Sequence, residues 1–376
     1  MPDFIGGLEL SRRFYHEAIR PILDAEFPDL RHSAALIGSG SEVLGYDTER
    51  STDHGWGPRI LLFLTADDVE HYRAPIFDTL ARQLSRRFLG YSTYFDESPA
   101  EPGTAVLADV EPGPINHGVT VTTVEAFWRD HVGLDADAAP TVADSLTLPE
   151  QKLLELTAGA VFHDGLGTLA PLRARYAYYP QDVWRYRLAA QWQRLGQLEP
   201  FVGRTGEVGD DLGSGLIAAS QVRDVMRLCF LMERRYAPYP KWFGAAFARL
   251  LCAPTLTPLL TNALRATSWQ ERERHLSPAY EHVAEMHNAL AITPPLDPTV
   301  RPFSAGRSRS SSPNASPRRS WPPSPTPPFE PSPAATARST NSPTAPTSSP
   351  TPRSTRSCAR STSRNIAPRR DRAGVG

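Results

Sequence analysis

Hydrophobic positions in the first 140 residues follow two different periods. Apolar residues recur every three or four positions over residues 8–27, which predicts an amphipathic helix that ends before Pro28. The runs 34–37 and 60–64 are short, apolar and bounded by turn residues, a pattern typical of buried strands. Residues 118–124 are β-branched and predict a third strand. The pattern therefore indicates a mixed α/β domain.

The helical period returns after the second strand and dominates beyond residue 146. Thr65 is the expected N-cap of a helix over residues 66–88, which Pro75 should kink or split. Residues 133–145 are polar and alanine-rich and predict a linker. Beyond it the pattern predicts helices and no strand, at residues 149–162, 169–176, 181–197, 211–236, 240–251, 257–266 and 268–290. We therefore expect an α+β fold, with a mixed α/β domain at residues 1–140 and an all-α helical domain at residues 146–296.

Composition separates residues 301–376 from the rest of the chain. This tail holds 15 prolines, 17 serines and 13 arginines but only two acidic residues. The preceding 300 residues hold 27 basic and 39 acidic residues, so the net charge of −1 combines an acidic body with a basic tail. A basic segment with few aliphatic side chains cannot bury a core, and we expect the tail to be disordered.

Two interpretations of the tail are open. It is either a disordered basic arm that binds nucleic acid or another polyanion without sequence preference, or a frameshift artefact read from GC-rich DNA. The abrupt change in composition favours the second interpretation. Apart from the tail, the acidic body argues against nucleic acid as a partner.

Other features narrow the class of protein. The chain has no run of about 18 apolar residues and no charged-then-apolar leader, so we expect a cytoplasmic protein that does not bind a membrane. Its three cysteines form no CxxC pair, which argues against a zinc site and a disulfide framework.

The stretch GSGSEVLGYDTERSTDHGWGPR at residues 38–59 joins the first two predicted strands and is the candidate site. Small residues at Gly38, Ser39, Gly40 and Ser41 let the backbone approach a ligand, and N–H groups in such a turn bind phosphate. Asp53 lies 12 residues beyond Ser41, where its carboxylate can hold a metal ion. A simple tight loop and a turn-capping aspartate are the alternative interpretations.

This arrangement resembles the nucleotidyltransferase superfamily, which includes the aminoglycoside adenylyltransferases and the small antitoxin-type transferases. The segments YYPQDVWRYRLAAQW, FVGRTGEVGDDLGS and YAPYPKWFGAAF, at residues 178–192, 201–214 and 236–247, resemble a bacterial family known as domain of unknown function 4037. The resemblance covers residues 5–300. It implies a nucleotidyltransferase fold with a helical C-terminal region, a nucleoside triphosphate as substrate and Mg²⁺ as cofactor.

One departure from the family pattern bears on activity. The central motif of the family is Asp-His-Asp-Trp-Gly, whereas this chain has Asp-His-Gly-Trp-Gly at residues 53–57, so Gly55 replaces the second carboxylate. Two carboxylates one residue apart on a strand share a face and can hold metal ions together. Glu42, Asp47 or Glu49 could take the place of this second carboxylate, although their spacing from Asp53 does not support it. Glu125 is the candidate nearest to the third predicted strand for a third acid.

Three further positions carry charge near the motifs. Lys241 is one of only two lysines, and it either contacts a triphosphate from the helical domain or is a solvated lysine at the start of a helix. Arg204 lies with Asp210 and Asp211 in a glycine-rich segment that is either a loop lining a cleft or a capped helix N-terminus. Arg59 either packs at the strand or approaches a phosphate.

Two functions from different classes are open. The first is a magnesium-dependent nucleotidyltransferase that moves a nucleotide from a nucleoside triphosphate to a hydroxyl group of an unknown acceptor. The four residues 38–41 and Lys241 would then contact phosphate, and Asp53 would hold the metal as the catalytic residue. The second is a non-catalytic nucleotide-binding or regulatory module whose metal site is degraded at Gly55. Covalent transfer of a labelled nucleotide distinguishes the two.

Overall fold

The computed structural model describes residues 4–53, 55–98, 104–108 and 113–300. The chain divides into two units after Thr326, and all described residues belong to the first, Met1–Thr326. The tail predicted to be disordered, residues 301–376, lies outside the described residues. The predicted division of the first unit near residue 140 stays a prediction.

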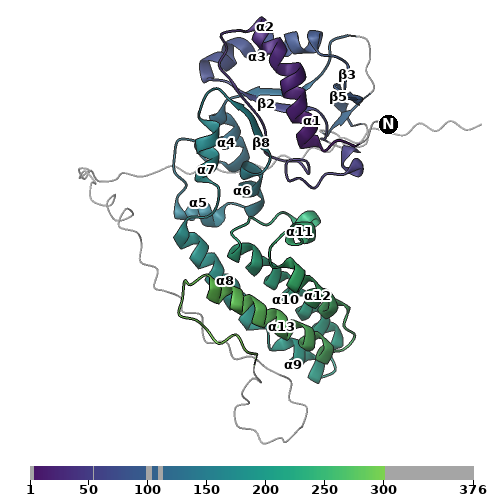
Figure 1. The fold of residues 1–376 in the computed structure, drawn as a ribbon, viewed down its shortest axis with the longest axis vertical. Coiled ribbons are helices and arrows are strands. Elements are labelled where there is room, and N and C mark those ends of the chain that lie inside the picture. The colour runs from purple at the N-terminus through teal and green to yellow at the C-terminus, as the bar shows by residue number, and fades with distance from the viewer. Residues whose placement is uncertain (1–3, 54, 99–103, 109–112, 301–376) are drawn as a thin grey trace, which may run out of the picture. The chain divides into compact units, whose positions relative to one another are not determined.

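A mixed four-stranded sheet organises the N-terminal part, with strands in the order β7-β2-β1-β8 (Figure 1). The strands are β1 (Ser33–Leu36), β2 (Arg59–Phe63), β7 (Gly118–Thr122) and β8 (Ala160–Asp164). β1 is antiparallel to β2 and to β8, with Ala34 opposite Leu62, whereas β2 and β7 are parallel. The three strands predicted from apolar runs are therefore confirmed.

Helices cover both faces of the sheet because successive strand residues point to opposite faces. Ala34 and Leu62 share one apolar core with residues from the N-terminal helices and α3. These helices are α1 (Gly7–Phe14), the π-helical turn η1 (Tyr15–Ile19), α2 (Arg20–Glu26) and α3 (Ala66–Gln83). Ala35 and Phe63 instead join a second core with α4 (Val124–Val132) and α6 (Glu150–Thr157).

The start of α3 follows the predicted cap. Thr65 accepts a hydrogen bond from the backbone N–H of Asp68 at 3.2 Å, and the helix continues through Pro75 without splitting. Two short hairpins occupy the turn-rich segment that follows. They are β3–β4 (Arg87–Phe88 and Tyr91–Ser92) and β5–β6 (Phe95–Glu97 and Ala105–Leu107).

The prediction of one helix over residues 149–162 was wrong at its C-terminal end. The structure ends α6 at Thr157 and begins strand β8 at Ala160. Gly159 lies between them, and a Cβ atom there would collide with the carbonyl oxygen of Leu36. The apolar run after α6 continues the helical period, so only its long-range pairing with β1 reveals the strand.

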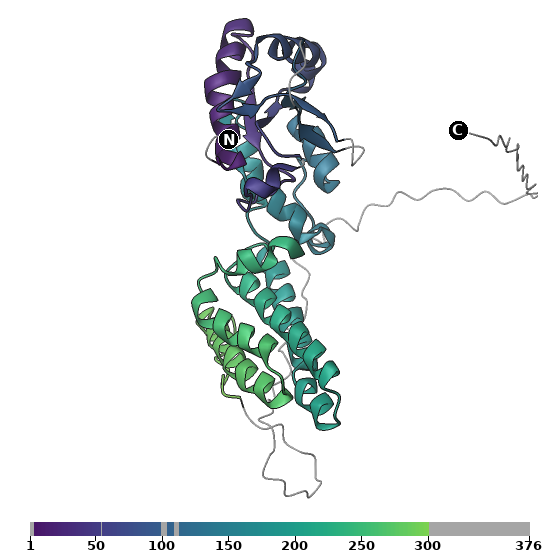
Figure 2. The same cartoon turned by 90° about the vertical axis from the view of Figure 1, so that its right-hand side faces the viewer.

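Beyond β8 the described residues up to 300 form a succession of helices (Figures 1 and 2). They are α7 (Leu169–Arg175), α8 (Gln181–Leu198), α9 (Phe201–Glu207), α10 (Asp211–Met232), α11 (Pro240–Phe247), α12 (Ala253–Arg265) and α13 (Trp269–Ala289). α10 packs against α8, α9, α12 and α13, and its residues Val225 and Leu228 are fully buried. The α+β class predicted from the sequence is confirmed.

The linker prediction was wrong at its C-terminal end, and the loop alternative for the glycine-rich segment after residue 200 is excluded. The predicted linker at residues 133–145 runs into helix α5 (Val142–Thr147), which begins with a capping box between Thr141 and Asp144. The glycine-rich segment after residue 200 contains α9, where Gly206 packs against the indole ring of Trp269 so closely that a Cβ atom would collide with it. Glycine therefore serves close helix packing at this position.

Among the described helices, none has both the length and the apolar composition needed to cross a membrane.

Candidate functional site

Strand β1 leads directly into the Gly/Ser turn. The backbone N–H of Gly38 donates a hydrogen bond of 2.9 Å to the carbonyl oxygen of Glu155, which anchors the turn to α6. Gly40 has φ +148°, and a Cβ atom there would lie 2.6 Å from the carboxylate oxygens of Glu42. The turn therefore needs glycine at this position for both its conformation and its packing.

The turn leaves a set of backbone donors without partners. The carbonyl oxygens of Gly40 and Ser41 accept hydrogen bonds from Leu44 and Tyr46 at 3.3 and 2.9 Å. Within the described part of the chain, the N–H groups of Ser39, Gly40 and Ser41 have no acceptor. This is the arrangement at the start of a helical turn, where unpaired N–H groups carry partial positive charge and attract anions.

Arg59 braces the turn against the first residue of β2. Its guanidinium forms an ion pair with the carboxylate of Glu42, whose side chain is 2% exposed, and donates a hydrogen bond of 3.4 Å to the carbonyl oxygen of Ser39. The Nε atom of Arg59 is buried and has no hydrogen-bond partner. Arg59 therefore holds the turn in place and retains one unused donor.

Glu155 gathers polar groups beneath the turn. Its carboxylate accepts hydrogen bonds from Gln151 at 2.8 Å and from the hydroxyl of Ser39 at 3.4 Å, and Lys152 lies 3.4 Å away. Nε2 of His131 is 3.1 Å from Oε2 of Glu155, but its direction departs from that of a hydrogen bond. Burial raises the pKa of Glu155, but the close contact with His131, the hydrogen bond from Gln151 and the charge of Lys152 outweigh burial and lower the pKa to about 2.

Asp53 lies neither on a strand nor directly before one, so it cannot form a strand-borne pair with residue 55. It ends the 3₁₀ turn Glu49–Asp53, and β2 begins six residues later at Arg59. Gly55 has φ +60°, in the left-handed region, and its N–H donates to the carbonyl oxygen of Ala105 at 2.7 Å. Residues 53 and 55 therefore do not share a strand face. His54 lies outside the described residues, and the structure describes only the backbone of Asp53.

The alternative acids have other surroundings. Asp47 accepts hydrogen bonds from the N–H of Gly7 at 2.6 Å and from the indole of Trp56 at 2.9 Å, so it holds the start of α1. Trp56 is 1% exposed and therefore packs in the core. Glu49 and Glu125 are exposed.

A cavity of about 440 Å³ collects most of the predicted site residues. Lys241, at the start of α11, lines it together with the Gly/Ser turn, although the two lie about 200 residues apart in the sequence. Ser51 and Gly55, which flank Asp53 on both sides, also line it. The lining residues are Ser39, Gly40, Ser41, Glu42, Leu44, Ser51, Gly55, Arg59, Gln151, Glu155, Tyr239 and Lys241.

Lys241 has no carboxylate partner among the described residues. Its Nζ atom lies 5.0 Å from the ring centroid of Trp242. A lysine whose charge is not neutralised by an acid is available to an anion in the cavity. Gly38, by contrast, is not among the lining residues and its N–H is already used.

Sequence reasoning missed Gln151, Glu155 and Tyr239. Gln151 and Glu155 lie four residues apart on α6 and therefore share a helix face, which was the one available signal. Asp210 and Asp211 were predicted either to line a cleft or to cap a helix, and both lie at the N-terminus of α10. Asp210 caps α10 through the N–H of Gly213 at 2.8 Å, and Asp211 forms an ion pair of 2.6 Å with Arg272.

The described acidic side chains around the Gly/Ser turn do not form the ligand set that magnesium needs. Within the described ranges, no three His, Cys, Asp or Glu side chains form a group able to hold a metal ion. Glu42 and Glu155 already face Arg59 and Lys152, and Gly55 supplies no ligand. The described residues therefore do not fit a two-metal site.

The comparisons with known proteins support the resemblance seen in the sequence. Residues 146–243 match the family described as "Domain of unknown function (DUF4037)". The predicted resemblance to that family is therefore confirmed over this segment. None of the curated proteins compared with the chain matches it.

One similar solved structure is the crystal structure of a nucleotidyltransferase-like protein from Exiguobacterium sibiricum 255-15. The two sequences are 10% identical, and the superposition covers 75% of this chain and 79% of that chain with a TM-score of 0.28.

Proposed function

We propose that this chain binds the phosphate groups of a nucleoside triphosphate at the Gly/Ser turn and transfers the nucleotide to a hydroxyl group of an acceptor. One observation carries the proposal: a single cavity brings together unpaired backbone donors and an unneutralised lysine. The donors are the N–H groups of residues 39–41, and the lysine is Lys241.

The chemistry of nucleotidyl transfer matches such a cavity. The acceptor oxygen attacks the α-phosphorus, the bond to the bridging oxygen of pyrophosphate breaks, and the acceptor proton leaves to a base. The protein need only hold the phosphates in line with the acceptor and stabilise their charge. Preorganised N–H groups and a lysine supply that stabilisation without rearranging during the reaction.

The expected role of Asp53 as catalytic and metal-binding residue stays a prediction. Its neighbours Ser51 and Gly55 line the cavity, which supports a place for Asp53 at the rim. Magnesium can be held by one carboxylate together with substrate phosphates. We therefore keep Mg²⁺ as an expectation that rests on Asp53 alone.

A second function, nucleotide binding without transfer, is favoured by a different observation. Gly55 lacks a carboxylate, and no group of three potential metal ligands occurs in the described part of the chain. A protein of this kind would use the same phosphate contacts for regulation. Transfer chemistry separates the two functions, whereas nucleotide binding is common to both.

The test of the shared step is equilibrium binding of labelled ATP, GTP, CTP and UTP, with and without magnesium. Replacing Lys241 by Gln should lower the affinity for nucleotide about tenfold, since a hydrogen bond to a charged group contributes roughly 1.5–3 kcal/mol. Arg73→Gln removes an exposed cation from α3, outside the cavity, and serves as the matched control. Equal affinity in parent and Lys241→Gln would overturn the proposed phosphate site.

The test of transfer uses α-labelled nucleotide and a pool of small hydroxyl compounds. A labelled product together with released pyrophosphate supports the transferase. Binding without either product, across a broad acceptor panel, supports the non-catalytic module.

A further inference from the structure

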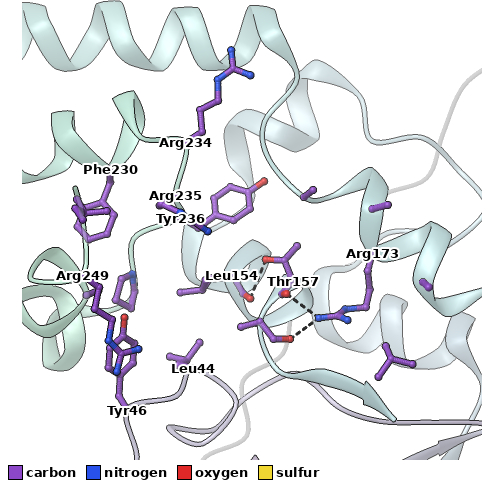
Figure 3. A pocket seen from close by; sticks show the side chains of 18 residues that line it. Leu44, Tyr46, Leu154, Thr157, Arg173, Phe230, Arg234, Arg235, Tyr236 and Arg249 are labelled. Carbon is purple, nitrogen blue, oxygen red and sulfur yellow. Dashed lines mark hydrogen bonds between the residues drawn. The ribbon is translucent and has the colours of Figure 1, made fainter. Parts of the chain in front are cut away.

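A second cavity, of about 830 Å³, lies next to the proposed phosphate site (Figure 3). Leu44 lines both cavities, and Pro238 in this cavity is the chain neighbour of Tyr239 in the other. Side chains from α6, α7 and α10 and from the loops around α11 surround it. Figure 3 shows Arg173 and Arg249 on opposite sides, with Leu154 and Thr157 between them.

The charged residues of this cavity all have the same sign. They are Arg173, Arg234, Arg235 and Arg249, and neither Asp nor Glu is among the lining residues. Within the described residues, none of the four has a carboxylate within 4.0 Å. Four positive charges without acidic partners create a strong preference for negative charge in the space between them.

Arg173 is the most enclosed of the four. Its guanidinium donates to the carbonyl oxygens of Leu156, Thr157 and Ala158 at 2.8–2.9 Å, at the C-terminal end of α6. Burial lowers the pKa of Arg173. Carbonyl dipoles partly stabilise the buried cation, but they carry no net charge that would neutralise it.

Arg249 and Arg235 differ in how much of their binding capacity is used. Arg249 donates to the carbonyl oxygen of Gly45 at 2.7 Å and lies 4.0 Å above the ring of Tyr46. The side chain of Arg235 is exposed and makes no hydrogen bond or ion pair with a described residue. Arg235 is therefore the arginine with the most donors available to a ligand. Arg234 is turned to Gln181 and the ring of Trp184.

We propose that the acceptor is a small anionic molecule with a hydroxyl group, held in this cavity through its carboxylate or phosphate. That the bound molecule is the acceptor rests on the proposed function, whereas the binding of an anion in this cavity does not depend on that function. Apolar side chains such as Leu154, Val161 and Phe230 offer contacts for the carbon skeleton. A polycationic acceptor would face the like charges of Arg173, Arg235 and Arg249, so the cavity argues against that class.

The first test measures ligand binding without nucleotide, by thermal shift and calorimetry at constant ionic strength. The probes are 3-phosphoglycerate and glucose 6-phosphate as phosphate-bearing hydroxyl compounds, tartrate as a carboxylate-bearing one, glucose as neutral and kanamycin as cationic. We expect the anionic probes alone to bind. The stronger of the phosphate and carboxylate arms identifies the anionic group. Equal binding of glucose or kanamycin would overturn the proposal.

Variants assign the binding to the cavity. Arg235→Gln should lower the affinity for the best anionic probe about tenfold, as loss of a charge-assisted hydrogen bond does. Arg235→Lys should recover most of that affinity. Arg223→Gln, an exposed arginine of α10 outside the cavity, is the matched control. Unchanged anion binding in Arg235→Gln and in Arg249→Gln would overturn the proposal.

A third variant separates this inference from the proposed function. Lys241→Gln should lower the affinity for nucleotide but leave the affinity for the anionic probe unchanged. If anions bind through Arg235 while no nucleotide binds, the proposed function fails and the anion site stands. If nucleotide binds and is transferred while no anionic probe binds, the anion site fails and the proposed function stands.

Discussion

Gln151 joins the carboxylate of Glu155 to the backbone of Tyr239. Its Nε2 atom donates a hydrogen bond of 2.8 Å to Glu155, and its Oε1 atom accepts one of 2.8 Å from the N–H of Tyr239. Glu155 lies beneath the Gly/Ser turn, and Tyr239 is the N-cap residue of the helix that carries Lys241. One amide therefore helps to fix the position of Lys241 relative to the turn.

Replacing Gln151 by Ala should destabilise the protein and loosen the site. The change removes a part-buried hydrogen bond to Glu155 and an exposed one to the Tyr239 N–H, and such bonds each contribute about 0.5–1.5 kcal/mol. We expect a lower urea midpoint and weaker nucleotide binding than in the parent. Gln197→Ala, on the exposed face of α8, is the control and should change neither. A Gln151→Ala variant as stable as the control would show that the bridge contributes little.

Acid should remove stability that Glu155 contributes. Its pKa is about 2 in the folded chain, below the ordinary value of 4.5, so between these values the unfolded state binds the additional proton. The contribution is therefore complete above pH 4.5 and is lost as the pH falls toward 2. We expect the urea midpoint of Glu155→Gln to fall less than that of the parent between pH 5 and 3. Parallel pH profiles for the two proteins would contradict this assignment.

The candidate site was predictable where local residue chemistry determines it. The Gly/Ser turn follows from small residues after an apolar strand, and Lys241 drew attention as one of two lysines. The expectation that residues 53 and 55 share a strand face was wrong, because Gly55 and Gly57 adopt positive φ and β2 begins only at Arg59. Glu155 was missed because its role depends on long-range contacts that no local pattern records.

The same limit explains the errors in the fold. Local start signals, Pro180 before α8 and the Ser268 cap of α13, allowed these two helices to be predicted close to their observed bounds. Strand β8 is defined by its pairing with β1, about 125 residues earlier in the chain. Helix α9 contains two glycines and is stabilised by tertiary packing against α10 and α13, which overrides its weak local propensity.

Truncation after Val300 should leave stability and nucleotide binding unchanged. The backbone N–H of Val300 donates to Glu281 at 2.9 Å, so the last described residues still contact α13. Beyond them the sequence is rich in Pro, Arg and Ser, a composition from which we expect little buried apolar area. Differential scanning calorimetry of the full chain and of residues 1–300 measures the effect. A fall of several degrees in Tm on truncation would show that the tail belongs to the fold.

The change Gly55→Asp tests whether the rim beside Asp53 can hold a metal ion. Position 55 lines the phosphate cavity, and a Cβ atom there meets nothing within 4 Å, so an aspartate has space. Its φ of +60° makes any L side chain unfavourable by about 1–2 kcal/mol, although Asp tolerates this region better than most residues. Without metal, we therefore expect Gly55→Asp to be less stable than the parent.

Magnesium and a triphosphate should reverse that order if the metal expectation is right. A second carboxylate near Asp53 adds a ligand, and binding to the folded state alone raises the Tm by linkage. The rise in Tm should be largest in Gly55→Asp, smaller in the parent and smallest in Asp53→Ala. Gly55→Asn has nearly the same backbone cost without the charge and should respond as the parent does. Equal rises in all four proteins would mean that no metal is held here, because the nucleotide would then bind through the turn and Lys241 alone.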